Sequence, residues 1–111
     1  MQVSFTDERL AVSCSDSRKR KSIHGINRGK KIGIRLDDLK AAESLQDMRS
    51  LPGKCHELKG DRSGTLALPL DGLYRLIIEP DHDPLPMKED GGLDWHQVTR
   101  VTVIRIEDYH G

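Results

Sequence analysis

The chain is poor in cysteine, aromatic side chains and long apolar runs, and each deficit excludes a class of protein. Its 111 residues include two cysteines, Cys14 and Cys55, whose separation matches no metal-ligand spacing. One Phe, one Trp and two Tyr are too few for a platform that stacks single-stranded bases. No apolar run has the length of a transmembrane helix, and none opens the chain as a leader. We therefore expect a reduced cytoplasmic protein with no membrane contact, no bound metal and free or buried thiols rather than a disulfide.

The chain also lacks net charge, but its charges are segregated along the sequence. Lys and Arg number 18 and so do Asp and Glu. Residues 1–54 hold 12 basic and seven acidic residues, whereas residues 55–111 hold six and 11, so the halves carry +5 and −5. The basic excess lies in Arg18-Lys19-Arg20-Lys21 and Arg28-Gly29-Lys30-Lys31. Such a stretch is either a solvated helix face or a contact for a polyanion.

The first half of the chain predicts one strand followed by helices. Residues 1–5 alternate between apolar and polar side chains, as a strand does, and residues 6–25 are weakly helical. Across residues 26–43 apolar side chains recur at helical steps, which predicts an amphipathic helix. The recurring side chains are Ile32, Leu36, Leu39 and Ala42. Gly29 and Gly33 each disfavour a helix by about 1 kcal/mol, so we expect its first half to be frayed or kinked.

The second half predicts strands joined by turns. Strands are expected at residues 55–58, 65–70, 74–79 and 98–106. Asp71-Gly72 is a hairpin turn, and the acidic, proline-rich residues 80–94 form a long exposed loop. The order of elements predicts one α+β domain over residues 1–111. In it an N-terminal strand and two to three helices pack on a curved, mainly antiparallel sheet.

Two polar clusters carry groups that move or hold protons. The first spans residues 56–62 and begins with His56, and the second is Glu107-Asp108-Tyr109-His110. Histidine titrates near neutrality and can therefore give or take a proton there. The structural alternatives are a partly exposed His56 before a solvated turn, and a Tyr109 that serves as a core aromatic with a wet hydroxyl.

Arg75 is the most informative single charge, because it lies in an otherwise apolar strand. An isolated cation is costly to bury, so Arg75 needs a partner. That partner is either a bound anion or a carboxylate of Glu107 or Asp108. The sequence leaves both alternatives open.

The ordered set of these motifs resembles the HigB branch of the RelE/ParE toxin superfamily. The family pattern His-x-Leu-Lys-Gly-Asp-Arg-x-Gly is matched by residues 56–64, and Leu51-Pro52-Gly53 before it is also similar. An aromatic-Arg strand follows as Tyr74-Arg75-Leu76-Ile77, and the terminal Glu-Asp-Tyr-His motif is residues 107–110. The resemblance covers about residues 32–111 well. It also indicates that the acidic loop, about residues 80–97, is an insertion.

The resemblance implies the toxin of a type II toxin–antitoxin pair, with a RelE/ParE-like fold. Such a toxin is a ribosome-dependent mRNA endonuclease that needs neither metal nor cofactor. It is silenced by a helix-turn-helix antitoxin, which also sets the oligomeric state. The RNA 2′-hydroxyl attacks the adjacent phosphate, which requires a base, an acid and positive charge on the phosphoryl oxygens.

The same resemblance assigns roles to residues of this chain. The acid–base residues are His56, Asp108, Tyr109 and His110. The phosphate and RNA contacts are Lys59, Arg62, Arg75, Arg18, Lys19, Arg20, Lys21, Lys30 and Lys31. For Arg62 the alternative to an RNA contact is a structural role in its turn, and the same holds for Asp61 beside it.

Two other functions remain open. The superfamily also contains proteins that poison DNA gyrase without nuclease chemistry, and a third reading is an inactive relative that only binds its antitoxin. The proton-carrying residues favour the nuclease, since a gyrase inhibitor has no need of acid–base groups.

Overall fold

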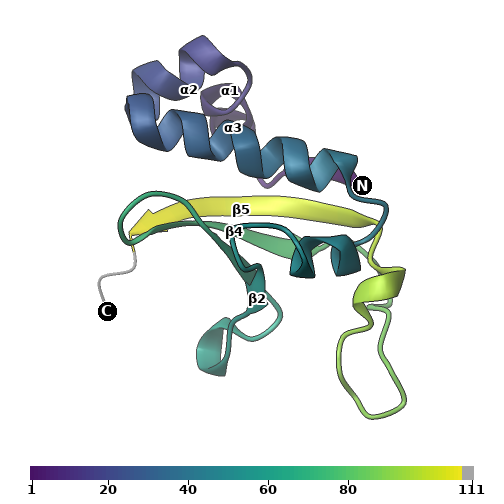
Figure 1. Ribbon diagram of the computed structural model, residues 1–111. Coiled ribbons are helices and arrows are strands. Elements are labelled where there is room, and N and C mark those ends of the chain that lie inside the picture. The colour runs from purple at the N-terminus through teal and green to yellow at the C-terminus, as the bar shows by residue number, and fades with distance from the viewer. Residues whose placement is uncertain (109–111) are drawn as a thin grey trace.

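Three helices cover one face of a five-stranded sheet in the computed structural model, which describes residues 1–108 (Figure 1). The helices are α1 (Glu8–Ser13), α2 (Ser17–His24) and α3 (Ile26–Ala41). The strands are β1 (Gln2–Phe5), β2 (His56–Glu57), β3 (Leu66–Pro69), β4 (Tyr74–Pro80) and β5 (Arg100–Asp108). Short 3-10 helices are η1 (Leu45–Arg49), η2 (Gly60–Arg62) and η3 (Trp95–Gln97). None of the helices within residues 1–108 has the length and apolar composition of a membrane span.

The sheet confirms the predicted α+β architecture. Its strand order is β1-β5-β4-β3-β2, in which only β1 and β5 run parallel. The N-terminal strand therefore lies beside the C-terminal strand, although nearly the whole chain separates them. All the predicted strands are present, but β4 extends through Pro80 and β5 through Asp108.

Aspartates begin the two short helices. The side chain of Asp7 accepts a hydrogen bond from the Leu10 amide, and that of Asp16 accepts one from the Lys19 amide, each over 2.8 Å. Each carboxylate satisfies an amide that lacks a partner in the first turn of the helix. These caps define α1 and α2 where the periodicity of the sequence is weak.

The α3 helix is continuous through Gly29 and Gly33, so the expected fraying of its first half is wrong. Both glycines are buried under α2. A Cβ at Gly29 would lie 2.7 Å from the backbone of Arg20 and Lys21, and one at Gly33 would lie 2.9 Å from the Arg20 guanidinium. The glycines therefore allow the two helices to approach closely, and that packing offsets their low helix propensity.

The core lies between α3 and the sheet. Ile32, Leu36 and Leu39 of α3 are buried against inward-facing strand residues. Those residues are Leu66, Leu68, Leu76, Ile78, Val101 and Val103. Because side chains alternate along a strand, the residues between them lie on the opposite face of the sheet. Arg75 and Glu107 therefore lie on the face that the helices do not cover.

Candidate functional site

One carboxylate, Glu107, binds three guanidinium groups on the uncovered face of the sheet. Arg75 Nη2 lies 3.3 Å from Glu107 Oε1, and Arg105 Nε lies 3.3 Å from Oε2. Arg62 Nη1 also donates to Oε1. We call Glu107 and these three arginines the arginine cluster.

The sheet register builds the arginine cluster. Arg75 of β4 pairs directly with Glu107 of β5, and Arg105 lies two residues earlier on the same face of β5. Arg62 reaches the same carboxylate from η2, 45 residues away in sequence. Arg75 was expected to need either a bound anion or a carboxylate as its partner, and the structure shows the carboxylate of Glu107. Arg62 has an ion-pair partner as well.

Three guanidinium groups contact the Glu107 carboxylate in the arginine cluster. Burial opposes ionisation of Glu107, but hydrogen bonds and positive charge from Arg62 and Arg105 outweigh it and lower the pKa of the carboxyl. The side chains of Arg75 and Glu107 are 11% and 13% exposed, whereas those of Arg62 and Arg105 are 40% and 46% exposed. The open side of the cluster thus presents positive charge to solvent.

His56 is exposed on the short edge strand β2. Its Nδ1 lies 3.0 Å from the Lys54 carbonyl oxygen, which can only accept, so Nδ1 carries the proton. In the neutral ring Nε2 then keeps its lone pair for a substrate proton. Lys59 is exposed in the turn that follows β2.

The sheet does not bring His56 next to the end of β5. His56 pairs with Ala67, which pairs with Ile77, which pairs with Arg105. Three strand spacings separate the two ends of that row, about 14 Å in all. Asp108, which pairs with Tyr74, is exposed and lies farther along β5.

The other two residues predicted to act in acid–base catalysis, Tyr109 and His110, lie outside the described residues. The catalytic roles of His56, Asp108, Tyr109 and His110 therefore stay predictions.

The predicted RNA contacts of α2 and α3 lie on the helical side of the sheet. Arg18, Lys19, Lys21, Lys30 and Lys31 are all exposed, and within residues 1–108 none of them forms an ion pair. Arg20 differs, because it is half-buried and its Nη1 donates to the Cys14 carbonyl over 3.0 Å. Its guanidinium links α2 to the end of α1, so the exposed five are better placed to meet a polyanion.

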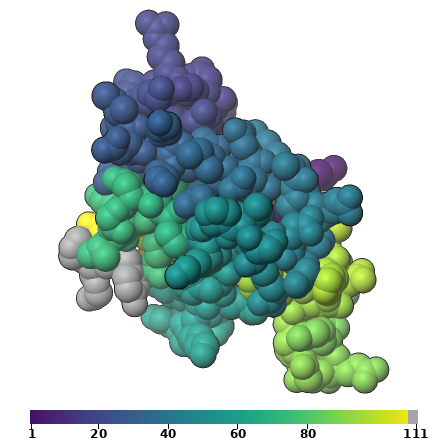
Figure 2. All heavy atoms as spheres, viewed as in Figure 1, coloured from purple at the N-terminus to yellow at the C-terminus, as the bar shows by residue number. Residues whose placement is uncertain are grey.

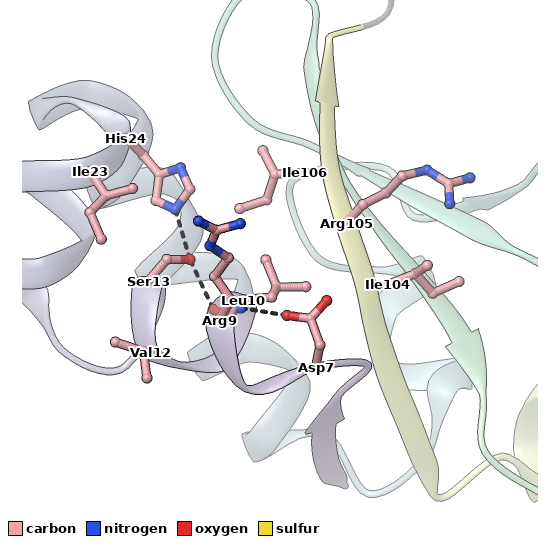
Figure 3. Close-up of a pocket in the computed structure, with 10 residues that line it drawn as sticks. All are labelled: Asp7, Arg9, Leu10, Val12, Ser13, Ile23, His24, Ile104, Arg105 and Ile106. Atoms are coloured by element: carbon pink, nitrogen blue, oxygen red, sulfur yellow. Dashed lines mark hydrogen bonds between the residues drawn. The ribbon is translucent and has the colours of Figure 1, made fainter.

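An apolar groove that was not predicted lies beside β5 and has a volume of about 640 Å³ (Figure 3). Its lining residues are Asp7, Arg9, Leu10, Val12, Ser13, Ile23, His24, Ile104, Arg105 and Ile106. β1 pairs with β5 only as far as Val103, and no strand within residues 1–108 pairs with that edge beyond it. Two of its apolar lining residues, Val12 and Ile23, are exposed.

His24 forms part of the groove wall through a contact between α1 and α2. Its Nε2 lies 3.1 Å from the Ser13 hydroxyl, which donates to the Leu10 carbonyl (Figure 3). Because Ser13 uses its proton there, its oxygen accepts from His24. Burial, together with the charge of Arg28, lowers the pKa of His24.

Comparison with known proteins identifies the architecture. No protein-family model and no curated protein sequence matches this chain. Among solved structures, a YoeB/ParE toxin from Agrobacterium tumefaciens superposes with a TM-score of 0.59. The match covers 99% of this chain and 100% of that one, at 16% sequence identity. The chain has a RelE/ParE toxin fold. The HigB branch, by contrast, rests on the sequence motifs alone.

The RelE/ParE fold here carries a long connection between β4 and β5, residues 81–99, which protrudes from the body of the molecule (Figure 1, Figure 2). His82 Nε2 accepts from the amides of Thr99 and Arg100, at 3.0 and 3.3 Å, and so closes its base. Trp95 is 3% exposed and donates from Nε1 to Glu57 over 3.0 Å. The acidic loop is therefore held at its base by His82 and attached to β2 by Trp95.

Both cysteines of the domain are free and buried. Burial raises the pKa of Cys55 to about 12 and also raises that of Cys14. A thiol that stays protonated is a poor nucleophile. In the described part of the chain, no three His, Cys, Asp or Glu side chains gather in a way that could hold a metal ion.

Proposed function

We propose that this protein is the toxin of a type II toxin–antitoxin pair and that it cleaves mRNA on the ribosome. The observation that carries the proposal is a cation-rich cluster on the open face of a RelE/ParE-type sheet. The structural neighbour is itself a toxin. The HigB-like motifs at residues 56–64 and 107–110 add the proton-carrying groups.

The reaction needs no group from outside the chain and the RNA. A base removes the proton of the 2′-hydroxyl, the oxygen attacks the adjacent phosphorus, and the bond from phosphorus to the 5′-oxygen breaks. An acid returns a proton to that leaving oxygen, which leaves a cyclic phosphate and a 5′-hydroxyl. His56, through Nε2, is suited to the base, and the terminal Asp108, Tyr109 and His110 supply the acid.

Positive charge has two separate tasks in this proposal. Lys59, Arg62 and Arg75 stabilise the extra negative charge of the phosphorane-like transition state. The exposed basic residues of α2 and α3 contact ribosomal RNA through its phosphates, on the other side of the sheet. Two distinct cationic surfaces let the protein hold the ribosome and the mRNA at the same time.

The antitoxin, a helix-turn-helix protein, is proposed to bind the groove between α1, α2 and β5. The groove is apolar and lies beside a β5 edge with no strand partner within residues 1–108. An extended or helical partner segment can bury Val12 and Ile23 there, which are 44% and 54% exposed. Two segments are candidates for the antitoxin contact, the basic residues 18–31 and the acidic residues 79–94, and a partner in this groove would lie beside the first of them.

The test is induced expression of the wild type, of His56→Gln and of His110→Gln in bacterial cells, followed by mapping of mRNA 5′ ends. We expect new ends at in-frame codon positions with the wild type and none with either variant. Growth arrest with intact mRNA would instead support a gyrase-type inhibitor. No arrest at all, with the antitoxin still bound, would indicate an inactive relative.

A further inference from the structure

We propose that Arg35 and Lys54 are positioning residues for His56. Arg35 holds the turn before β2 in a left-handed backbone conformation, and the carbonyl of Lys54 then determines which nitrogen of the His56 ring carries the proton. The inference rests on the proposed function for the use of that ring in cleavage, but the position of the proton can be measured without RNA. It also gives a role to the Leu51-Pro52-Gly53 motif, which has no part in the proposed reaction.

Arg35 of α3 is a buried cation that bridges the end of β3 and the turn before β2. Its side chain is 8% exposed. Its Nε donates to the Pro69 carbonyl over 2.9 Å, and its Nη1 donates to the Pro52 carbonyl over 3.3 Å. The Asp38 carboxylate lies 3.9 Å from Nη1, one turn along the same helix. Because the guanidinium is planar and rigid, its two bonds fix the turn relative to the sheet.

The pairing of β2 with β3 leaves the Lys54 carbonyl without a donor from the sheet. Leu58 donates to Thr65 directly opposite over 2.9 Å, so every second pair counted from there exchanges hydrogen bonds. Four residues back along β2, the register places Lys54 opposite Pro69. Proline has no amide hydrogen to give, so the ladder ends at this pair. The Lys54 carbonyl is therefore available to a side chain.

The turn itself has an unusual backbone. The angle φ is +110° at Gly53 and +43° at Lys54, which is the one non-glycine residue with a positive φ within residues 1–108. A Cβ at Gly53 would lie 2.7 Å from Cζ of Arg35, so the guanidinium lies directly against the turn. A residue with a side chain keeps a left-handed conformation only where its surroundings impose it. We assign that constraint to Arg35, which contacts Gly53 and binds the Pro52 carbonyl before it.

The left-handed turn directs the Lys54 carbonyl to the ring of His56. The distance from its oxygen to Nδ1 is 3.0 Å, and within residues 1–108 this is the one hydrogen bond of the ring. Because a carbonyl oxygen only accepts, the bond selects the form with the proton on Nδ1. Without it, the exposed ring would carry its proton on either nitrogen, and Nε2 would be a base in only part of the molecules.

The experiment measures the tautomer of His56 by nitrogen–proton NMR at alkaline pH, without RNA, in the wild type, Lys54→Val and Lys54→Gly. The Lys54 side chain is exposed, so both substitutions act on the turn and leave the core unchanged. Glycine adopts a positive φ readily, whereas a β-branched residue does not. We expect the Nδ1–H form to exceed the Nε2–H form about tenfold in the wild type and in Lys54→Gly, and the two forms to be about equal in Lys54→Val.

Two results would overturn the proposal: a wild-type ring with its proton mainly on Nε2, or a Lys54→Val protein with the wild-type ratio. His82 is a control within the same spectra. Its Nε2 accepts from the amides of Thr99 and Arg100, so its proton lies on Nδ1 and should stay there in every variant. A change at His56 alone is therefore the expected result.

Arg35→Lys tests the role assigned to the guanidinium. Lysine keeps the charge but lacks the planar group that binds two carbonyls at once. We expect the mixed tautomers of Lys54→Val, and a folded Arg35→Lys protein with the wild-type ratio would overturn the role of Arg35. Should this variant not fold, the wild type provides the test. A nuclear Overhauser effect is expected between Nε–H of Arg35 and an α-proton of Gly53, and its absence would contradict the contact.

The two proposals fail separately, because the tautomer of His56 does not depend on cleavage. The expected tautomers, together with intact mRNA in cells that express the wild type, would leave the positioning of His56 standing and remove the nuclease. Cleaved mRNA with the same tautomer ratio in Lys54→Val and the wild type would remove the positioning role and leave the nuclease.

Discussion

Arg75 is a largely buried cation that pairs with a carboxylate on the neighbouring strand. Its place in an apolar strand required a counter-charge, and the sequence restricted the candidates to a bound anion or the carboxylates of residues 107 and 108. Only the β4–β5 register selects Glu107, because a shift by one residue would turn that side chain to the other face. Arg105 and Arg62 were not foreseen as partners of the same carboxylate.

At the residue scale, the lowered pKa of Glu107 predicts an acid-sensitive contribution to stability. The folded-state pKa lies below the usual value of 4.5, so the contribution is fully present above pH 4.5 and is lost as the pH falls through the lowered value. We expect the urea midpoint of the wild type to fall between neutral pH and pH about 3, and that of Glu107→Gln to fall less. Asp71→Asn is the control, which should retain the wild-type acid dependence. Parallel curves for the wild type and Glu107→Gln would contradict the prediction.

At the element scale, the close contact between α2 and α3 could not be predicted from the sequence. Glycine lowers helix propensity whatever surrounds it, and the sequence alone shows only that cost. The tertiary structure shows the backbone of Arg20 where a Cβ at Gly29 would lie. A residue that disfavours a helix locally can thus be the one that allows it to pack.

This contact predicts different outcomes for two equivalent substitutions in α3. Gly29→Ala places a methyl group 2.7 Å from backbone atoms that cannot move alone, so we expect a loss of about 1–3 kcal/mol in the free energy of unfolding. Gly33→Ala meets only the end of the flexible Arg20 side chain, at 2.9 Å, and gains helix propensity. Its change should stay within about 1 kcal/mol. Chemical denaturation of both variants measures this difference. Equal losses in the free energy of unfolding would show that the close approach of α2 and α3 does not determine the effect of the substitution.

The acidic loop is a second element with a testable anchor. Substitution of His82 by Ala removes the acceptor for the Thr99 and Arg100 amides, which leaves the base of the loop open. We expect faster proteolysis within residues 81–99 and an almost unchanged thermal midpoint, because His82 is not one of the core residues. His96→Ala is the matched control, since its exposed side chain has no hydrogen bond within residues 1–108. A loop that is cut equally fast in both variants would refute the anchoring role.

At the scale of the whole molecule, the neutral net charge conceals two oppositely charged ends. The basic helix α2 and the acidic loop lie at opposite ends of the molecule, with the sheet between them (Figure 1, Figure 2). Such a charge distribution orients the molecule in the field of a polyanion, with the helices toward it and the loop away. The charge of the acidic loop is therefore compatible with RNA binding at the helices.

This orientation predicts a specific salt dependence of RNA binding. The double substitution Lys19→Gln and Lys21→Gln should reduce the slope of log K against log salt by about 1.4 for a single-stranded RNA, about 0.7 for each lost phosphate contact. Lys88→Gln with Arg100→Gln removes the same charge at the acidic end of the molecule and should leave the slope unchanged. Filter binding over a salt series provides the measurement. A similar change in both double variants would show that only net charge matters.

The sequence by itself determined the fold class, the strands and the long helix, because side-chain periodicity and turn residues report local geometry directly. It also named Arg75 as a residue in need of a counter-charge. The tertiary structure decided which residues meet: Glu107 with three arginines, Gly29 with the Arg20 backbone, and α1 and α2 with the open edge of β5. Strand register, helix approach and cavities depend on residues distant in the chain, so no local pattern encodes them.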